Sequence, residues 1–499
     1  MEKLSFNSYD STCFPVWDIT QAYEPETLLE FTQEERPKST MSSWILGLGG
    51  FFLGLFMQMM AQQNIGPVLF VIPVFLLGLV PVTIPFLSDR WSRRAYVLTF
   101  GMVIFIGGLY QVYQNNVIGM GLFSDENTFY GYASVGLGGT YDWRNEGYWI
   151  PLLIWRFFYS VSNAIGTGNG PWIGPVVNAL MVAWSAAILL RTAKYIFGPD
   201  DSRLRRLGTF FAASGIFWLY GACFLRDCFA LILQVITLWA LVRCLCLINI
   251  KNIVIAALAI LFCVVMMQGI RGRTLPMFMA FVALAAFSWT RRKGTSVGSL
   301  VLILFGGLVL VVVAKLVLAY FGSAVQDVLS SAEGRGYGQD IEGGNSLTKS
   351  FVMSQPLPIR MIAGSLLLLI YPIPLWTHFF IGAPGYVWMK GLHGCLMVLI
   401  IVPLLCVGIW RCFIVAIKGG REGVVAFFLM SYAILTLMAL AASAIDTRYL
   451  GQFLPVIFIL AVIPDWRDPI TRSKIVTVGT IWYSIVFLGH SFWLVLKLF

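Results

Sequence analysis

Charged residues are scarce in this chain. Only 12% of its 499 residues are Asp, Glu, Lys or Arg, whereas a soluble globular protein carries roughly 25%. In contrast, 58% of the residues are hydrophobic, which is more apolar surface than a water-soluble core normally buries. The composition therefore excludes an ordinary soluble enzyme and favours a protein surrounded by a lipid bilayer.

Signatures of soluble catalysis are missing as well. The three histidines, His378, His393 and His490, stand apart from carboxylates at metal-ligand spacing. No Walker loop, nucleophile elbow or dinucleotide fingerprint occurs in the context that it requires. We therefore expect no metal site among these residues and no cofactor. The net charge of +10 comes from short loops and not from one continuous basic face, so we expect no nucleic-acid partner.

Apolar runs of about 20 residues, long enough to cross a bilayer as helices, recur along the chain. Each must be helical, because lipid offers no partner to open backbone groups. We predict an all-α polytopic transmembrane helical bundle over residues 42–499, with about 13 spans. Residues 1–41 form a polar cytoplasmic tail without a cleavable signal peptide. The predicted spans are 42–62, 67–87, 95–116, 172–195, 207–225, 228–247, 252–269, 274–290, 297–320, 392–415, 423–443, 449–464 and 475–498.

Basic clusters at alternating turns set the predicted orientation. Placing them in the cytoplasm puts the N-terminus inside and the loops 117–171 and 321–358 outside. The second loop is rich in Gly and Ser, which fits a flexible substrate cover and equally a plain linker. The clusters are Arg90, Arg93 and Arg94; Arg191, Lys194, Arg203, Arg205 and Arg206; Arg291, Arg292 and Lys293; Lys418 and Arg421; Arg467, Arg472 and Lys474.

Two apolar segments do not fit this alternation. Residues 360–382 are interrupted by Pro372 and Pro374, which remove backbone donors. A re-entrant or interfacial helix therefore fits the segment better than a straight span. Residues 151–167 disturb the alternation of the basic loops in a milder way, so they are predicted to lie at the outer interface.

Two adjacent carboxylates, Asp125 and Glu126, open the first outer loop. Sugar transfer needs a base that deprotonates the acceptor hydroxyl, and a carboxylate at the membrane interface suits that task. The nearby Tyr130 and Tyr132 are candidates for stacking on sugar rings. A solvated loop with an interfacial aromatic belt explains the same pattern and stays open as an alternative.

Arginines accompany the short outer turns. Arg226 and Asp227 interrupt nearly 40 apolar residues between 207 and 247, and charge retained at bilayer depth usually indicates function. Guanidinium groups bind phosphate oxygens bidentately and stay charged in a low dielectric, so a lipid diphosphate is the expected ligand. Arginines that only anchor lipid headgroups are the alternative. The candidate diphosphate-binding residues are Arg226, Arg271, Arg273, Arg360 and Arg448.

These residues resemble a known family. The chain is similar to the Wzy-type polymerases of O-antigen and exopolysaccharide repeat units and to related glycosyltransferase-C-like membrane proteins. The resemblance rests on Ser124-Asp125-Glu126 with Tyr130 and Tyr132, on Arg226-Asp227 within 224–231, on Arg271-Gly272-Arg273, on Tyr371-Pro372-Ile373-Pro374-Leu375-Trp376, and on Arg448-Tyr449 before Phe453-Leu454-Pro455.

The resemblance implies transfer of a polyprenyl-diphosphate-linked glycan onto another lipid-linked unit at the outer face of a bacterial inner membrane. Asp125 or Glu126 would then be the base or would position the sugar, and Asp227 would orient an arginine. Arg226, Arg271, Arg273 and Arg448 would bind the diphosphate. A chain-length regulator is a candidate partner, and dependence on a divalent cation stays open.

Other functions remain in competition. A ligase, or a transferase that uses a polyprenyl-phosphate sugar, would employ the same residues. A flippase for lipid-linked oligosaccharides would instead line a central cavity with ionisable groups. A purely structural subunit would have no convergent charged site.

Overall fold

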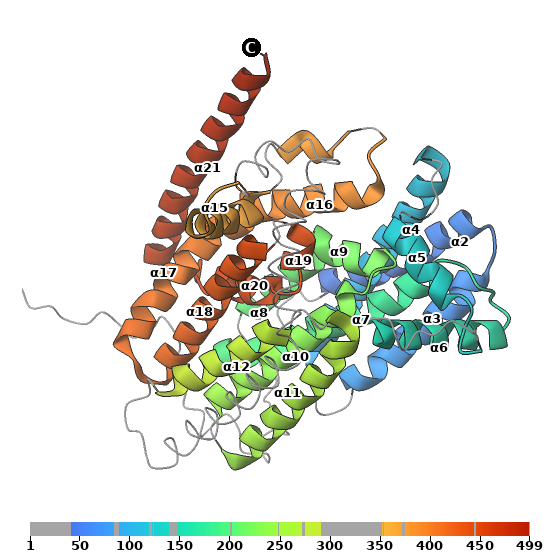
Figure 1. The fold of residues 1–499 in the computed structure, drawn as a ribbon, viewed down its shortest axis with the longest axis horizontal. Coiled ribbons are helices and arrows are strands. Elements are labelled where there is room, and N and C mark those ends of the chain that lie inside the picture. The colour runs from blue at the N-terminus through green and yellow to red at the C-terminus, as the bar shows by residue number, and fades with distance from the viewer. Residues whose placement is uncertain are drawn as a thin grey trace, which may run out of the picture.

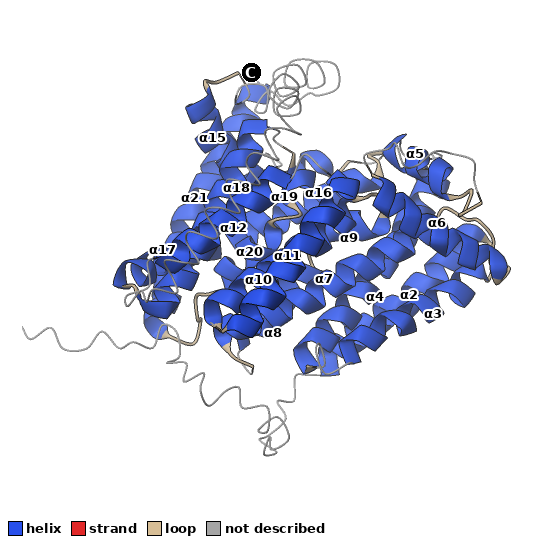
Figure 2. Ribbon diagram, turned by 60° about the horizontal axis from the view of Figure 1, so that its bottom comes forward, coloured by secondary structure: helices blue, strands red, loops and turns tan. Residues whose placement is uncertain are grey.

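Helices account for all the regular structure in the described part of the chain, in which no strand occurs (Figures 1 and 2). The computed structural model describes residues 41–83, 89–118, 122, 124–138, 148–199, 202–247, 249–271, 275–290, 352, 354–371, 375–380, 382–443 and 446–498. The elements are α2 (Met41–Gln62), α3 (Gly66–Thr83), α4 (Arg90–Tyr113), η3 (Gln114–Ile118), α5 (Ser124–Ala133), α6 (Trp149–Ala164), α7 (Ile173–Phe197), α8 (Ser202–Ala212), α9 (Gly215–Ala222), α10 (Asp227–Cys246), α11 (Ile250–Arg271), α12 (Leu275–Thr290), α15 (Leu357–Ile370), η6 (Leu375–His378), α16 (Gly385–Leu396), η7 (Met397–Ile401), α17 (Val402–Lys418), α18 (Gly420–Ser443), α19 (Thr447–Leu450), α20 (Leu454–Val462) and α21 (Pro469–Leu498).

Among the described residues, nine helices are long and apolar enough to cross a membrane. This supports a multi-pass membrane protein, while the count of about 13 spans is not confirmed. The expected tail, the span at 297–320 and most of the loop at 321–358 lie outside the described residues, as does the basic cluster at 291–293.

The N-terminal helices α2 to α6 gather on one side of the bundle and the C-terminal helices α15 to α21 on the other, with α7 to α12 between them (Figure 1). Some helices approach each other closely only because a facing residue is glycine. A Cβ added to Gly101 of α4 would lie 1.9 Å from the carbonyl oxygen of Gly47 in α2. Small residues of this kind let two helices approach closely in a membrane, where apolar burial alone drives little association.

The predicted span over 207–225 is wrong as a single helix. It consists of α8 and α9, which are separated at Ala213 and Ser214. A Cβ on Gly215 would lie 2.0 Å from the carbonyl oxygen of Met389, so α9 starts where the backbone of α16 crosses it. Similarly, the predicted span over 449–464 is divided into α19 and α20, neither of which is long enough to cross a bilayer.

The predicted span over 392–415 begins too late. Its helix starts at Gly385 and continues as α16, η7 and α17 to Lys418. The π-helical turn η7 breaks the regular backbone pattern, and the carbonyl groups of Val398 and Leu399 accept hydrogen bonds from Trp482 and Tyr483 of α21 at 2.8 and 2.6 Å. Turns of this type are a common cause of helix bending, and Figure 1 shows α16 and α17 running in different directions.

The interruption predicted within 360–382 is present. The segment contains the end of α15 and the short 3₁₀ helix η6, and the turn between them includes residues that the structure does not describe. Neither helix is long enough to cross a bilayer.

Helices α10 and α11 form an antiparallel pair that is held together by a polar side-chain contact at each end. At one end Arg271 donates to Asp227 at 2.8 Å. At the other end Arg243 donates to Asn252 at 3.0 Å. The charges suit the helix dipoles, because Asp227 opens α10 and Arg271 closes α11.

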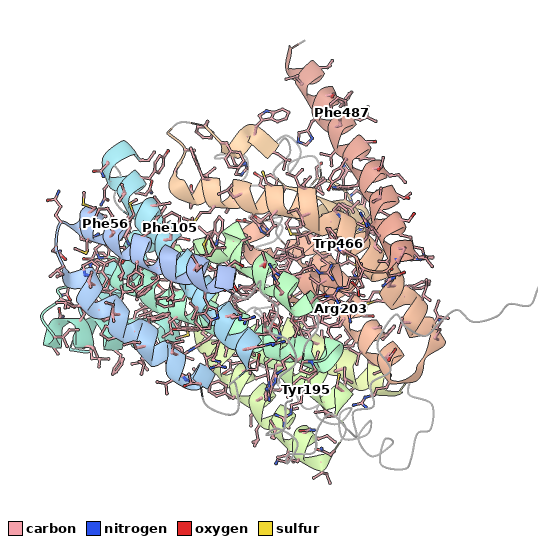
Figure 3. The ribbon with its side chains drawn as sticks, turned by 180° about the vertical axis from the view of Figure 1, so that it is seen from behind. Phe56, Phe105, Tyr195, Arg203, Trp466 and Phe487 are labelled. Carbon is pink, nitrogen blue, oxygen red and sulfur yellow. The ribbon has the colours of Figure 1, made fainter. Side chains whose placement is uncertain are left out.

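Two polar surfaces lie at opposite ends of the bundle. Helix α4 begins beside the ion pair between Asp89 and Lys194. Its Tyr110 contacts Glu126 near the other end of the helix, about 32 Å from residue 89 at 1.5 Å per residue. Arg206 donates to the carbonyl of Pro464 and lies over Trp466, so the basic loops near 90, 203 and 467 share one end. Figure 3 shows Arg203 and Trp466 together in this region. The arginines of the predicted outer turns meet at the other end.

Candidate functional site

Asp227 lies at the centre of a buried charge cluster. Its side chain is fully buried, and it is the first residue of α10. Arg271 contacts one carboxylate oxygen at 2.8 Å, and Arg448 contacts the other at 2.8 Å through Nη2. Gln452 also donates to Asp227 at 3.4 Å. Asp227 therefore joins the end of α11 to α19 and fixes two guanidinium groups that are distant in sequence.

Arg448 bridges two carboxylates. Its Nε and Nη2 contact Asp227, while its Nη1 contacts Asp125 at 2.9 Å. Burial by itself lowers the pKa of Arg448, but the carboxylates of Asp227 and Asp125 outweigh burial and raise the pKa above its ordinary value. Arg448 is therefore charged, and its planar guanidinium group bridges the buried Asp227 and the half-exposed Asp125.

The backbone around Arg448 is also held in place. Asp446 caps α19 by accepting from the Arg448 N–H at 2.9 Å, and Tyr220 donates to the Arg448 carbonyl oxygen. Lys390 of α16 contacts Asp446 at 3.1 Å. The position of this arginine thus depends on four helices besides its own, α5, α9, α10 and α16.

Two tyrosine rings support the remaining arginines. Arg226 lies over Tyr148 at 5.0 Å from the ring centre, and Arg271 lies over Tyr449 at 4.7 Å. Among the described residues Arg226 forms no ion pair. Burial, followed by the nearby charge of Arg271, lowers the pKa of Arg226 from its ordinary value. A bound anion would relieve this electrostatic cost.

These residues enclose a cavity of about 250 Å³. Three arginines and Asp125 line it, and Asp227 is buried behind two of the arginines. These five groups leave one positive charge in excess, which favours an anionic ligand. The only carboxylate that lines it among the described residues is Asp125. The lining consists of Asp125, Thr128, Phe129, Tyr148, Arg226, Arg271, Arg448 and Tyr449.

Glu126 does not belong to this cavity, which argues against the catalytic role expected for it. Its side chain is buried, one carboxylate oxygen accepts from the Tyr110 hydroxyl at 2.7 Å, and the other accepts from the Phe224 N–H at 2.7 Å. Successive residues of a helix point about 100° apart, so Asp125 faces the cavity while Glu126 faces the protein. Glu126 instead ties α5 to α4 and to the turn that carries Arg226.

The other candidates lie elsewhere. Tyr130 donates to the carbonyl of Asn169 at 2.9 Å, and the carbonyl of Tyr132 accepts from Arg156 at 2.9 Å. Neither tyrosine lines the cavity. Arg360 lies in the first turn of α15, and no contact of it with the cluster is present among the described residues. Arg273 is outside the described residues.

Three residues of the cluster were not among the predicted site residues: Tyr148, Tyr449 and Lys390. Tyr449 directly follows Arg448, and this adjacency was an available signal, whereas Tyr148 lies within the predicted loop 117–171 with no candidate arginine beside it in sequence. No sequence pattern marks Lys390, which lies between the predicted segments 360–382 and 392–415. It joins the cluster only because α16 approaches α19, where Lys390 contacts Asp446.

The described part of the chain holds no group of three or more His, Cys, Asp or Glu side chains arranged to bind a metal ion. Comparison of the chain with protein-family models, with curated proteins and with solved structures finds no match. The case for a function therefore depends on the geometry of the cavity.

Proposed function

We propose that the chain is a membrane glycosyltransferase that moves a polyprenyl-diphosphate-linked glycan onto another lipid-linked unit. The observation that carries this proposal is the cavity lined by Arg226, Arg271, Arg448 and Asp125, the last being the only lining carboxylate in the described part of the chain. A diphosphate matches the excess positive charge, and a carboxylate beside it matches the need for a base.

The reaction assigns a task to each group. Asp125 accepts the proton of the acceptor hydroxyl as the oxygen attacks the anomeric carbon of the donor glycan. The bond between this carbon and the diphosphate oxygen breaks, and the lipid diphosphate leaves with the electron pair. Arg226 and Arg271 stabilise the charge that develops on the leaving group. Asp227, buried behind them, positions Arg271 and Arg448.

The distribution of charge favours transfer over transport. The long helices α4, α7, α10 and α11 carry charged residues only near their ends, so ionisable groups do not follow these helices through the bundle. A flippase needs such a path for a charged headgroup. A ligase or a transferase that uses a polyprenyl-phosphate sugar shares the cavity chemistry and differs in its substrates.

We further propose that the cavity opens on the outer face of a bacterial inner membrane, with the basic end in the cytoplasm. The basic loops near 90, 203 and 467 share one end, as the preference of Lys and Arg for cytoplasmic loops requires. Labelling of single cysteines at positions 93 and 125 with an impermeant reagent in whole cells tests this orientation. Only the second is expected to react, and the reverse pattern would invert the proposal.

The function is tested with purified protein in detergent, supplied with the lipid-linked glycan extracted from cells that lack it. We expect wild-type protein to form longer lipid-linked chains without any membrane, which a flippase cannot do. Arg226→Ala and Asp125→Asn should abolish elongation. Arg93→Ala, which removes an exposed arginine at the opposite end, serves as the control and should keep it. Full elongation by both site variants would show that the cavity is not the active site.

A further inference from the structure

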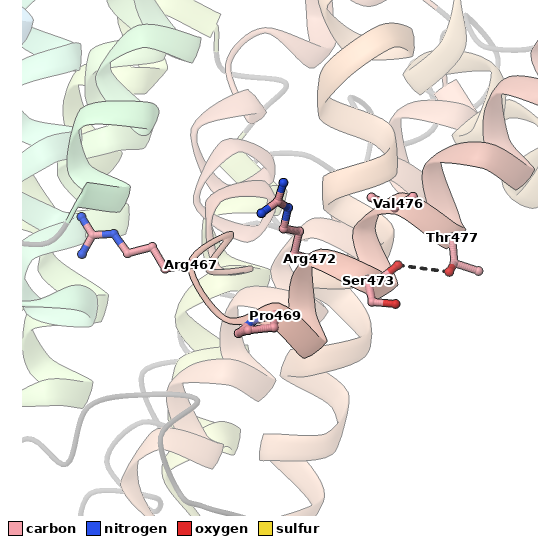
Figure 4. Close-up of a pocket in the computed structure, with 6 residues that line it drawn as sticks. All are labelled: Arg467, Pro469, Arg472, Ser473, Val476 and Thr477. Carbon is pink, nitrogen blue, oxygen red and sulfur yellow. Dashed lines mark hydrogen bonds between the residues drawn. The ribbon is translucent and has the colours of Figure 1, made fainter.

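A second cavity lies at the basic end of the bundle, where α21 begins. It measures about 380 Å³ and is separate from the site built around Asp227. All six lining residues come from one stretch, the turn before α21 and its first turns (Figure 4). They are Arg467, Pro469, Arg472, Ser473, Val476 and Thr477.

The two arginines of this cavity are available to a ligand. Neither Arg467 nor Arg472 has an ion pair among the described residues. Asp468, which lies between them in sequence, is already engaged by Arg411 at 3.2 Å and by the N–H groups of Ile470 and Thr471. Because Asp468 occupies these N–H groups, an anion here would be held by the guanidinium groups and not by the helix end.

The cavity lies at a boundary between polar and apolar surface. Arg467 precedes α21 and Arg472 lies in its first turn. This long helix is exposed over most of its length, with Ile470 at 66% and Val476 at 62% exposure. Figure 3 shows Phe487 on the part of α21 that extends beyond the bundle. Trp466, an amphipathic side chain of the type found at membrane interfaces, stands exposed next to Arg467.

We propose that this cavity binds the headgroup phosphate of an anionic phospholipid, whose acyl chains lie along the first turns of α21. The positive charges of Arg467 and Arg472, which both line the cavity, match the negative charge of the phosphate, and the adjoining apolar helix face matches the chains. Free phosphate would use the arginines alone and would gain nothing from Ile470 or Val476. The proposal is independent of the function assigned to the first cavity.

The test measures lipid binding to the purified full-length protein by native mass spectrometry. Dioleoyl phosphatidylglycerol and dioleoyl phosphatidylcholine are titrated separately. We expect wild-type protein to bind the anionic lipid more tightly, and Arg467→Gln/Arg472→Gln to weaken this binding about 30-fold. The matched control is Arg93→Gln/Lys418→Gln, which removes the same charge from exposed positions outside the cavity and should keep the affinity. Arg472→Gln alone should show about a fivefold loss.

Three results would overturn the proposal. The first is equal binding of both lipids to wild-type protein, and the second is equal loss of binding in the control. The third concerns a titration with inorganic phosphate. Phosphate would raise the melting temperature of wild-type protein but not of the double variant, and wild-type protein would bind both lipids equally. That pattern would identify a site for the free anion. Since neither guanidinium is paired, the double variant should melt within a degree or so of wild type.

Discussion

The Tyr110 hydroxyl donates to Glu126 at 2.7 Å, and this bond turns the carboxylate of Glu126 into the protein while its neighbour Asp125 faces the cavity. Two consecutive acidic residues therefore have different surroundings. One accepts two hydrogen bonds in a buried position, and the other is half exposed and paired with Arg448.

Isosteric replacement should have different effects at Asp125 and at Glu126. In Glu126→Gln the amide group cannot accept from both Tyr110 and the Phe224 N–H, so one buried donor loses its acceptor. We expect a loss of about 1–3 kcal/mol in the free energy of unfolding. Asp125→Asn should cost less than about 1 kcal/mol, because its ion pair is exposed, yet it should abolish elongation. Thermal unfolding in detergent and the elongation assay measure the two effects. A Glu126→Gln variant with wild-type stability would contradict the buried arrangement.

Arg448 and Arg226 line the same cavity, but their replacement should affect stability differently. Arg448→Gln leaves the buried Asp227 with only Arg271 as a cationic partner, and breaking a buried ion pair of this type costs about 3–5 kcal/mol. Arg226→Gln removes a guanidinium that pairs with no described carboxylate, so its melting temperature should stay close to wild type. Both variants should lose activity.

The double variant Asp227→Asn/Arg448→Gln should regain part of the lost stability, because it no longer leaves a buried carboxylate short of a partner. It should remain inactive. Equal destabilisation by Arg226→Gln and Arg448→Gln would refute the central role of Asp227.

Gly215 should tolerate no side chain. The Cβ of Gly215→Ala would lie 2.0 Å from the Met389 carbonyl oxygen and 2.9 Å from the His393 amide nitrogen, and both belong to backbone that cannot rotate away. We expect a loss of about 1–3 kcal/mol or more. Gly489→Ala on α21 is the control, since nothing lies within 4 Å of its Cβ and alanine favours a helix by up to about 1 kcal/mol. Similar melting temperatures for the two variants would show that α9 and α16 do not cross this closely.

Asp468 should make stability depend on acid pH. Hydrogen bonds from the Thr471 side chain and from the N–H groups of Ile470 and Thr471 hold the pKa of Asp468 below its ordinary value, despite an opposing effect of burial. The stabilisation is therefore complete above the unfolded-state pKa, near 3.9, and disappears as the pH falls through the lower folded-state pKa. Asp468→Asn, which keeps a capping group, should reduce the difference in melting temperature between pH 6 and pH 3. An unchanged pH profile would argue against this role for the cap.

Much of the architecture follows from composition and apolar run length. Spans such as 172–195 and 228–247 correspond to α7 and α10 within a few residues, because a bilayer requires helices of that length whatever their packing. The convergence of Arg226, Arg271 and Arg448 was also predictable, since short turns at one end of a bundle lie near one another.

The remaining features depend on contacts that a sequence does not display. Apolar residues continue through 207–225, yet the helix breaks where Gly215 meets α16. Glu126 and Asp125 look equivalent until Tyr110 selects one of them. The start of the helix at Gly385 likewise depends on its packing against neighbouring helices and not on hydropathy.

The polar contacts at the two ends of the α10–α11 pair have a consequence for the substitutions that this pair can accept during evolution. Only the Asp227–Arg271 end touches the cavity, while the Arg243–Asn252 end holds the helices in register from the far side. A substitution at the cavity end therefore leaves the Arg243–Asn252 contact at the other end of the pair in place.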